Sequence, residues 1–114
     1  MIKIYHNPRC KKSRAGLQYL EGKKVEFELI EYLKYPIDEE ELKDILVKLN
    51  LKPIDMVRTQ EEVYKKELKG KEFTDEEWIK IIVENPKLLK RPIVVKEYKA
   101  AWADPPEEID RLFN

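Results

Sequence analysis

The residue best suited to covalent chemistry is Cys10, the one cysteine of the chain. It stands where a strand-like pattern over residues 3–6 gives way to a helical pattern, so we predict that it opens a helix. Unpaired backbone N–H groups and the helix dipole stabilise an anion at such a position. The neighbouring cations Arg9, Lys11 and Lys12 also favour the thiolate. We therefore predict a reactive thiol in preference to a buried apolar filler.

The stabilisation that this thiol requires is modest. A free cysteine has a pKa near 8.5, so only about 3% of it is thiolate at pH 7. A pKa lower by roughly two units makes most of it thiolate and requires about 2.7 kcal/mol. A helix terminus can supply up to ~2 kcal/mol, and one cation or hydroxyl donor could supply the rest.

Two further candidates flank Cys10. His6, the one histidine, lies four residues before it, and Ser13 lies three residues after it. An imidazolium at His6 could stabilise the thiolate, or the ring could orient the loop. Ser13 could bond the sulfur, or it could satisfy an amide of the first helical turn. The sequence leaves both alternatives open for each residue.

Arginine is scarce, with five residues against eighteen lysines, and only its planar fork can hold an oxyanion in bidentate fashion. Arg58 follows an apolar segment, and Arg91 immediately precedes Pro92. Taken alone, each is more typical of a surface residue. A cis peptide bond at Arg91–Pro92 would place the Arg91 backbone against a neighbouring active loop, which we state as a hypothesis.

Composition excludes several classes of function. The 23 basic and 23 acidic residues give no net charge for non-specific binding to nucleic acid or anionic membranes. No apolar run is long enough to cross a bilayer, and the first residues do not resemble a signal peptide. One cysteine cannot form an internal disulfide or a multi-cysteine zinc site. We expect a cytoplasmic protein with no metal and no bound cofactor, whose second thiol comes from another molecule.

The pattern of elements predicts one α/β domain over residues 1–114. Its first part reads as a strand over residues 3–6, a helix from Cys10 to a C-cap near Gly22, and an alternating strand from Val25 to about Tyr32. These three elements form a βαβ unit, for which we expect parallel strands.

A helical insertion of about 38–90 follows. A capping box at Asp38 and Glu41 opens its first helix, and a second box at Thr74 and Glu77 opens its last. Between them we predict a short helix at Pro53 and a polar helix over about residues 61–68.

The final part is predicted as ββα. A β-branched strand over residues 93–95 turns near Glu97 into a strand over residues 100–103, and a helix begins with Pro105 in its first turn. The whole is then a four-stranded mixed sheet with helices on both faces.

The segment Tyr5-His6-Asn7-Pro8-Arg9-Cys10-Lys11-Lys12-Ser13-Arg14 resembles the Y-H-N-P-x-C-x-x-S-R signature of the ArsC-type, glutaredoxin-coupled arsenate reductases. Val57-Arg58 and the run Lys90-Arg91-Pro92-Ile93-Val94-Val95 are similar to other landmarks of that family. The resemblance spans essentially the whole chain and implies a thioredoxin-like fold with a helical insertion.

The resemblance also implies roles. Cys10 would attack arsenate and form a covalent cysteine–arsenate intermediate. Glutathione and then glutaredoxin would resolve the intermediate, with release of arsenite. His6 would lower the thiol pKa, and Ser13 would assist. The oxyanion would be bound by residues at four positions: Arg14, Arg58, Arg91 and Pro92, the last as the cis-proline of the fold.

Two comparisons limit this interpretation. Arsenate reductases that resemble small tyrosine phosphatases use Cys-x₅-Arg and several cysteines, whereas this chain has Gly16 and one cysteine. Longer relatives in the resembled family carry a third arginine where this chain has Asp104, and an acid there would repel an oxyanion. A glutathione-linked thiol oxidoreductase with another substrate is therefore the alternative. A regulator of the Spx type that binds RNA polymerase ranks below it, because Ser13 replaces the second cysteine common in those proteins.

Overall fold

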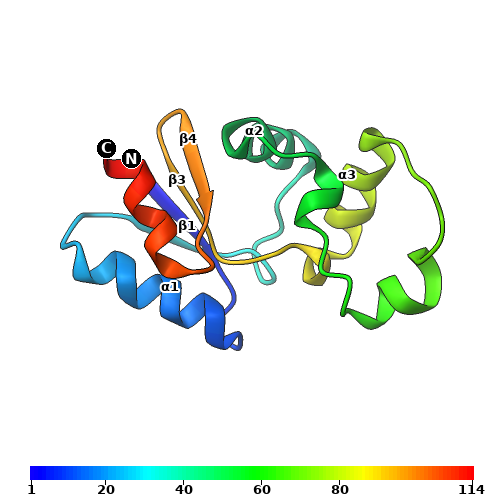
Figure 1. Cartoon of the computed structure of the whole chain (residues 1–114), viewed down its shortest axis with the longest axis horizontal. Helices are drawn as coiled ribbons and strands as arrows, with labels where there is room; N and C mark the ends of the chain where they lie inside the picture. The colour runs from blue at the N-terminus through cyan, green and yellow to red at the C-terminus, as the bar shows by residue number, and fades with distance from the viewer. The chain divides into compact units, whose positions relative to one another are not determined.

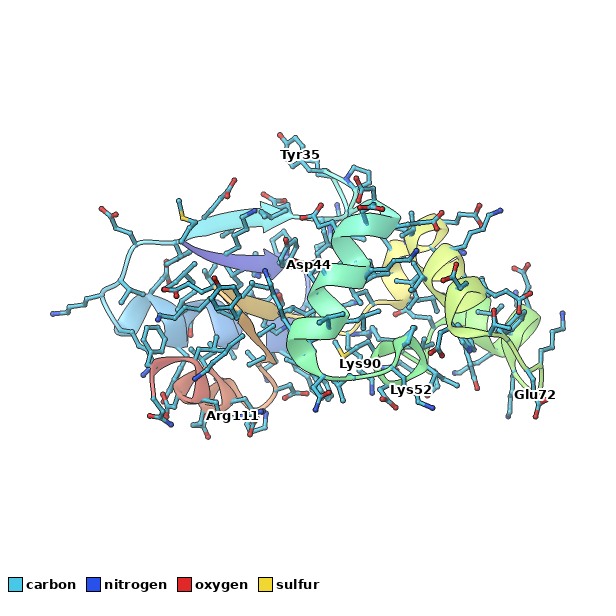
Figure 2. The ribbon with its side chains drawn as sticks, turned by 90° about the horizontal axis from the view of Figure 1, so that it is seen from above. Tyr35, Asp44, Lys52, Glu72, Lys90 and Arg111 are labelled. Atoms are coloured by element: carbon cyan, nitrogen blue, oxygen red, sulfur yellow. The ribbon has the colours of Figure 1, made fainter.

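The computed structural model describes residues 1–114, which form two compact units. The first unit comprises Met1–Tyr35 and Arg91–Asn114, and the second comprises Pro36–Lys90. Figure 2 labels Tyr35 and Lys90, the last residues before the chain passes from one unit to the other. The single domain over residues 1–114 stays a prediction.

The first unit is built on a four-stranded sheet (Figure 1). Its strands are β1 (Ile2–His6), β2 (Glu28–Glu31), β3 (Ile93–Lys96) and β4 (Lys99–Trp102), in the spatial order β2-β1-β3-β4. β1 pairs in parallel with β2, whereas β3 is antiparallel to both β1 and β4. The prediction of an α/β fold with a four-stranded mixed sheet is confirmed.

The β3–β4 hairpin is also confirmed: β3 begins at Ile93 as predicted, and β4 begins at Lys99, one residue earlier than predicted. Lys96 pairs with Lys99, so two residues form the turn, and Glu97 has a φ of 57°. The positive φ matches the backbone twist that two-residue hairpins prefer.

Two helices of the first unit cover one face of the sheet. α1 (Lys11–Gly22) contacts the 3₁₀ helix η4 (Pro106–Phe113), which lies between α1 and the β3–β4 hairpin in Figure 1. Apolar side chains from both helices and from β1, β3 and β4 form one core: Ile2, Ile4, Leu20, Val94, Ala101, Ala103, Ile109 and Leu112. This core fixes the start of α1 beside the end of β1, which is where Cys10 lies.

Three local predictions in this unit are corrected. The second strand is shorter than predicted. β2 begins at Glu28, which pairs with Lys3 near the start of β1, and residues 25–27 precede it outside the strand. The final helix begins at Pro106 with Pro105 as its N-cap, and it is 3₁₀ rather than α. α1 does end at Gly22, but its C-cap is Lys23, and the left-handed residue is Lys24 with a φ of 58°.

The second unit is helical. It contains α2 (Glu39–Leu49), η1 (Pro53–Met56), η2 (Tyr64–Leu68), α3 (Asp75–Glu84) and η3 (Pro86–Leu88). Both predicted helix starts are confirmed: the Asp38 side chain accepts from the Glu41 N–H, and Thr74 and Glu77 cap α3 reciprocally. The polar helix predicted for residues 61–68 is largely a π-helical turn. None of the helices in the chain has the length and apolar character needed to cross a bilayer.

Candidate active site

A tight loop delivers Cys10 to the start of α1. The Cys10 N–H donates to the Asn7 carbonyl at 3.0 Å, and the Arg9 N–H donates to the Asn7 side-chain Oδ1 at 3.0 Å. Asn7 is buried, so its two hydrogen bonds attach the loop to the interior of the unit. Cys10 itself is the N-cap of α1 and is partly exposed.

Opposing effects act on the ionisation of this thiol. Burial raises the pKa of the Cys10 thiol, but the backbone N–H of Ser13, the Arg91 guanidinium and the backbone N–H of Lys12 lower it by more. The resulting pKa lies below the ordinary value for cysteine. The arrangement therefore favours the thiolate form of Cys10 at the helix start.

His6 and Ser13 form a buried network next to the loop. His6 Nδ1 lies 2.8 Å from Ser13 Oγ, which also accepts a hydrogen bond from the Asn7 N–H at 3.0 Å. Burial lowers the pKa of His6, although the nearby Glu31 carboxylate partly offsets the effect. A lower pKa favours a neutral ring near pH 7. The structure thus places His6 against Ser13, whose own backbone N–H faces the thiol.

Hydrogen bonds to the backbone of Arg91 and Pro92 hold Arg91 in position. The peptide bond between Arg91 and Pro92 is cis, as hypothesised from the sequence. The Trp102 indole Nε1–H donates to the Arg91 carbonyl at 3.4 Å, and the Ala103 N–H donates to the Pro92 carbonyl at 2.9 Å. The end of β4 therefore holds the Arg91–Pro92 segment in place.

Gly16 lets α1 approach this segment closely. A Cβ atom at position 16 would lie 2.5 Å from Pro92 Cγ and 3.5 Å from the Ala103 Cβ. The first contact is far shorter than the usual carbon–carbon contact of about 3.5–4.0 Å. The sequence singled out Gly16 only as a departure from another family, and nothing local to it indicated this contact.

Two cationic residues of the first unit, Lys12 and Arg14, lie near the start of α1. Lys12 Nζ is 3.0 Å from Asp104 Oδ2, and the Asp104 side chain is only 24% exposed. Arg14, predicted to bind substrate, is exposed and donates from Nη1 to the Pro8 carbonyl at 2.9 Å. Both cations are therefore engaged by groups of the protein.

Arg58 belongs to the second unit. Its N–H donates to the Leu88 carbonyl at 2.7 Å, beside an isolated bridge that pairs Val57 with Leu89. Its guanidinium Nε lies 3.2 Å from Glu61 Oε2. The sequence places Glu61 three residues after Arg58, but the two side chains meet only because the backbone turns between them.

The structure thus groups four of the predicted residues within the first unit: His6, Cys10, Ser13 and Arg91. Pro92 is part of the same arrangement through Gly16. The five arginines differ in solvent exposure: Arg91 is buried, Arg58 is partly buried, and the other three are exposed. The roles of these residues stay predictions.

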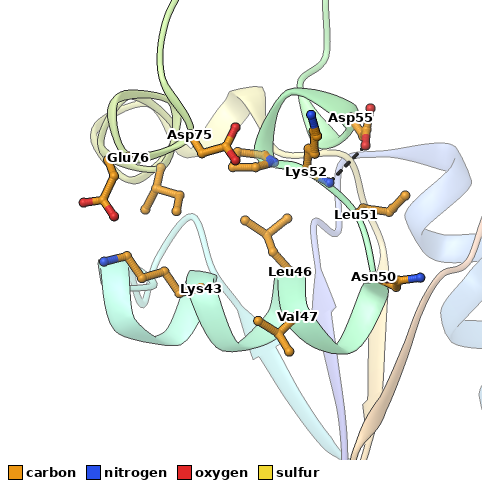
Figure 3. Close-up of a pocket in the computed structure, with 11 residues that line it drawn as sticks. Lys43, Leu46, Val47, Asn50, Leu51, Lys52, Asp55, Asp75 and Glu76 are labelled. Atoms are coloured by element: carbon orange, nitrogen blue, oxygen red, sulfur yellow. Dashed lines mark hydrogen bonds between the residues drawn. The ribbon is translucent and has the colours of Figure 1, made fainter.

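A pocket of about 750 Å³ lies in the second unit, and Arg58 is not among its lining residues. Its apolar lining includes Leu46, Val47 and Leu51, and its charged lining includes Lys43 and Glu76 (Figure 3). No cysteine, histidine or serine lines it.

Comparison with known proteins assigns the family. The ArsC family model matches residues 5–112. The chain belongs to the ArsC family. It is 42% identical to the "Arsenate reductase" of Neisseria meningitidis serogroup A over 97% of each chain, and 42% identical to the "Uncharacterized protein YfgD" of Escherichia coli K12 over 95% of this chain and 92% of that one.

A solved structure confirms the fold of this ArsC family member. Its structure superposes on the arsenate reductase from Vibrio cholerae with a TM-score of 0.91, at 37% identity, covering 97% of this chain and 96% of the other. The family resemblance recognised in the sequence is therefore correct, and the architecture expected from it is the one observed.

Proposed function

We propose that this protein is an arsenate reductase that uses glutathione and glutaredoxin. The observation that carries the proposal is the partly exposed Cys10 thiol, whose pKa is lowered by backbone N–H groups and by Arg91 at the start of α1. A thiolate held in this way is a competent nucleophile. The names of the relatives supply the substrate class.

In the proposed first step, the Cys10 thiolate attacks arsenic(V). A sulfur–arsenic bond forms as one arsenate hydroxyl takes up a proton from solvent and leaves as water, with no change in oxidation state. Arg91 and Arg58 neutralise the oxygen charge, as guanidinium groups do for developing oxyanions. Arg14 is a further proposed ligand, His6 and Ser13 shape the loop, and Pro92 fixes the backbone beside it.

The second sulfur comes from outside, because the chain has one cysteine. Glutathione displaces another hydroxyl as water and forms a second sulfur–arsenic bond. A glutaredoxin thiolate then takes the glutathione sulfur as a mixed disulfide, and the electron pair of the broken bond reduces arsenic(V) to arsenic(III). Water releases arsenite and returns the Cys10 thiol. Such a cycle needs a thiol-reducing compartment, so we propose the cytoplasm.

A coupled assay tests this function. Arsenate-dependent NADPH oxidation is measured with glutathione, glutaredoxin and glutathione reductase, for the wild type and for Cys10→Ser. We expect activity that requires both thiol components and disappears in Cys10→Ser. Absence of turnover from folded wild-type protein would exclude the proposal.

The Lys12–Asp104 ion pair favours a second candidate, a glutathione-linked thiol oxidoreductase with another substrate. The Asp104 carboxylate, held 3.0 Å from Lys12 Nζ, offsets a cation at the helix start and repels a doubly charged oxyanion. Two results together would favour this candidate. Asp104→Arg would raise arsenate reduction sharply, and the wild type would reduce glutathione mixed disulfides well.

A further inference from the structure

The ion pair between Arg58 and Glu61 is partly buried within the second unit. Their side chains are 18% and 23% exposed, and Arg58 Nε lies 3.2 Å from Glu61 Oε2. The Glu61 N–H also donates to the Arg58 carbonyl at 3.3 Å. The backbone turn therefore holds the carboxylate close to the guanidinium.

The contact uses one edge of the guanidinium. An arginine side chain carries five N–H donors, and Glu61 accepts from the Nε–H alone among the contacts that the structure gives this side chain. The edge formed by the two terminal nitrogens can still donate in parallel to two oxygens of an oxyanion. Arg58 is thus able to bind an oxyanion while Glu61 stays in place.

Glu61 nevertheless changes how strongly that oxyanion binds. An anion on the terminal edge is attracted by the guanidinium and repelled by the carboxylate on the neighbouring edge. Because the pair is largely shielded from water, salt screens this repulsion less than at a fully exposed site. The repulsion doubles for a doubly charged oxyanion, since Coulomb energy scales with charge.

We propose that Glu61 is a specificity-determining residue that weakens reversible oxyanion binding at Arg58. This inference rests on the proposed function, in which Arg58 binds the oxyanion. Inert oxyanions such as sulfate and phosphate are held poorly, because reversible contacts are all that they can make. Arsenate is retained because the thiolate captures it in the sulfur–arsenic bond described above. Selection then depends on covalent capture more than on initial affinity.

The test measures the binding of sulfate, an unreactive dianion, by isothermal titration calorimetry. The dissociation constant of sulfate is compared between the wild type and Glu61→Gln. We expect this constant to fall about tenfold in Glu61→Gln, because the repulsion is removed while an acceptor oxygen is kept. An unchanged or higher dissociation constant overturns the inference.

Two matched variants separate charge from structure. Glu62→Gln removes the adjacent carboxylate, which is 83% exposed and pairs with Lys66, and we expect a change of less than about twofold. Glu61→Asp keeps the charge and shortens the side chain, so it should resemble the wild type. A purely structural role for Glu61 predicts instead that Asp and Gln perturb the protein alike, with no gain in sulfate affinity.

The outcome for Arg58 distinguishes this inference from the proposed function. Adding Arg58→Gln to Glu61→Gln should abolish the gain in sulfate affinity. If Glu61→Gln shows no gain but Arg58→Gln alone lowers kcat/KM for arsenate, only the role of Glu61 is refuted. If Arg58→Gln changes neither sulfate affinity nor arsenate turnover, the oxyanion role of Arg58 and the inference fail together.

Discussion

The close approach of α1 to the Arg91–Pro92 segment predicts a sharp difference between two glycine substitutions. In Gly16→Ala the new Cβ would lie 2.5 Å from Pro92 Cγ, so one of the two groups must move by about 1 Å to reach an ordinary contact. Pro92 is held by the Ala103 N–H at 2.9 Å, and overpacking of this kind costs about 1–3 kcal/mol.

Gly22→Ala is the matched control. No atom lies within 4 Å of a Cβ built at position 22, and both glycines belong to α1. Alanine stabilises a helix relative to glycine by up to about 1 kcal/mol, so we expect Gly22→Ala to match or exceed the wild type. Comparing the two variants largely removes the effect of helix propensity and leaves the steric cost.

Urea unfolding gives the stability, and the pH dependence of alkylation gives the ionisation of Cys10. We expect the unfolding free energy of Gly16→Ala to lie about 1–3 kcal/mol below that of Gly22→Ala. We also expect a higher thiol pKa in Gly16→Ala, because displacement of Pro92 moves Arg91 away from the sulfur. Equal stability together with an unchanged alkylation profile would refute the argument that Gly16 positions Arg91.

Two further predictions concern ionisation. Arg91→Met removes a hydrogen bond and an attractive charge from the thiolate, so the midpoint of Cys10 alkylation should move to higher pH; Arg111→Met, which removes an exposed arginine paired with Glu108, should leave it in place. Burial lowers the pKa of His6 below the ordinary 6.5, so in the window below about 6.5 the unfolded chain binds more protons than the folded protein. The free energy of urea unfolding should therefore be lower at pH 5.5 than at pH 7. The difference between the two pH values should be smaller for His6→Gln, and an equal difference in both proteins would contradict a neutral buried ring.

Signals confined to a few neighbouring residues predicted the structure well. The reciprocal cap of Thr74 and Glu77 is observed as expected, because both partners lie within one turn. The placement of Cys10 at a helix start is correct for the same reason, since a strand pattern changes to a helix pattern at that residue. The position of the turn near Glu97 was also predicted from local sequence, and the structure closes it with two residues before Lys99.

The alternating apolar pattern before β2 predicted a strand that is longer than the one observed. Val25 and Phe27 alternate with charged residues and do pack against the core of the first unit. They are outside the sheet because β1 begins at Ile2, and the parallel ladder starts only with Lys3 and Glu28. An alternating pattern reports which side chains are buried, but a strand also needs a neighbour along its whole length.

The electrostatics of the site depended on contacts between distant residues. Cations next to Cys10 in the sequence suggested that side-chain charge would stabilise the thiolate. In the structure Lys12 contributes its backbone N–H, while its side chain pairs with Asp104. The main cationic contribution comes from Arg91, and no spacing rule connects residues so far apart in the chain.

The outer position of β2 has a consequence for behaviour at high concentration. An edge strand presents unpaired backbone groups to a second molecule, and Leu29, which is 41% exposed, adds an apolar contact. Glu28 and Glu31 stand at the two ends of this short strand. Two copies that meet edge to edge would bring these carboxylates together, so mutual repulsion guards against fibrous self-association at neutral pH.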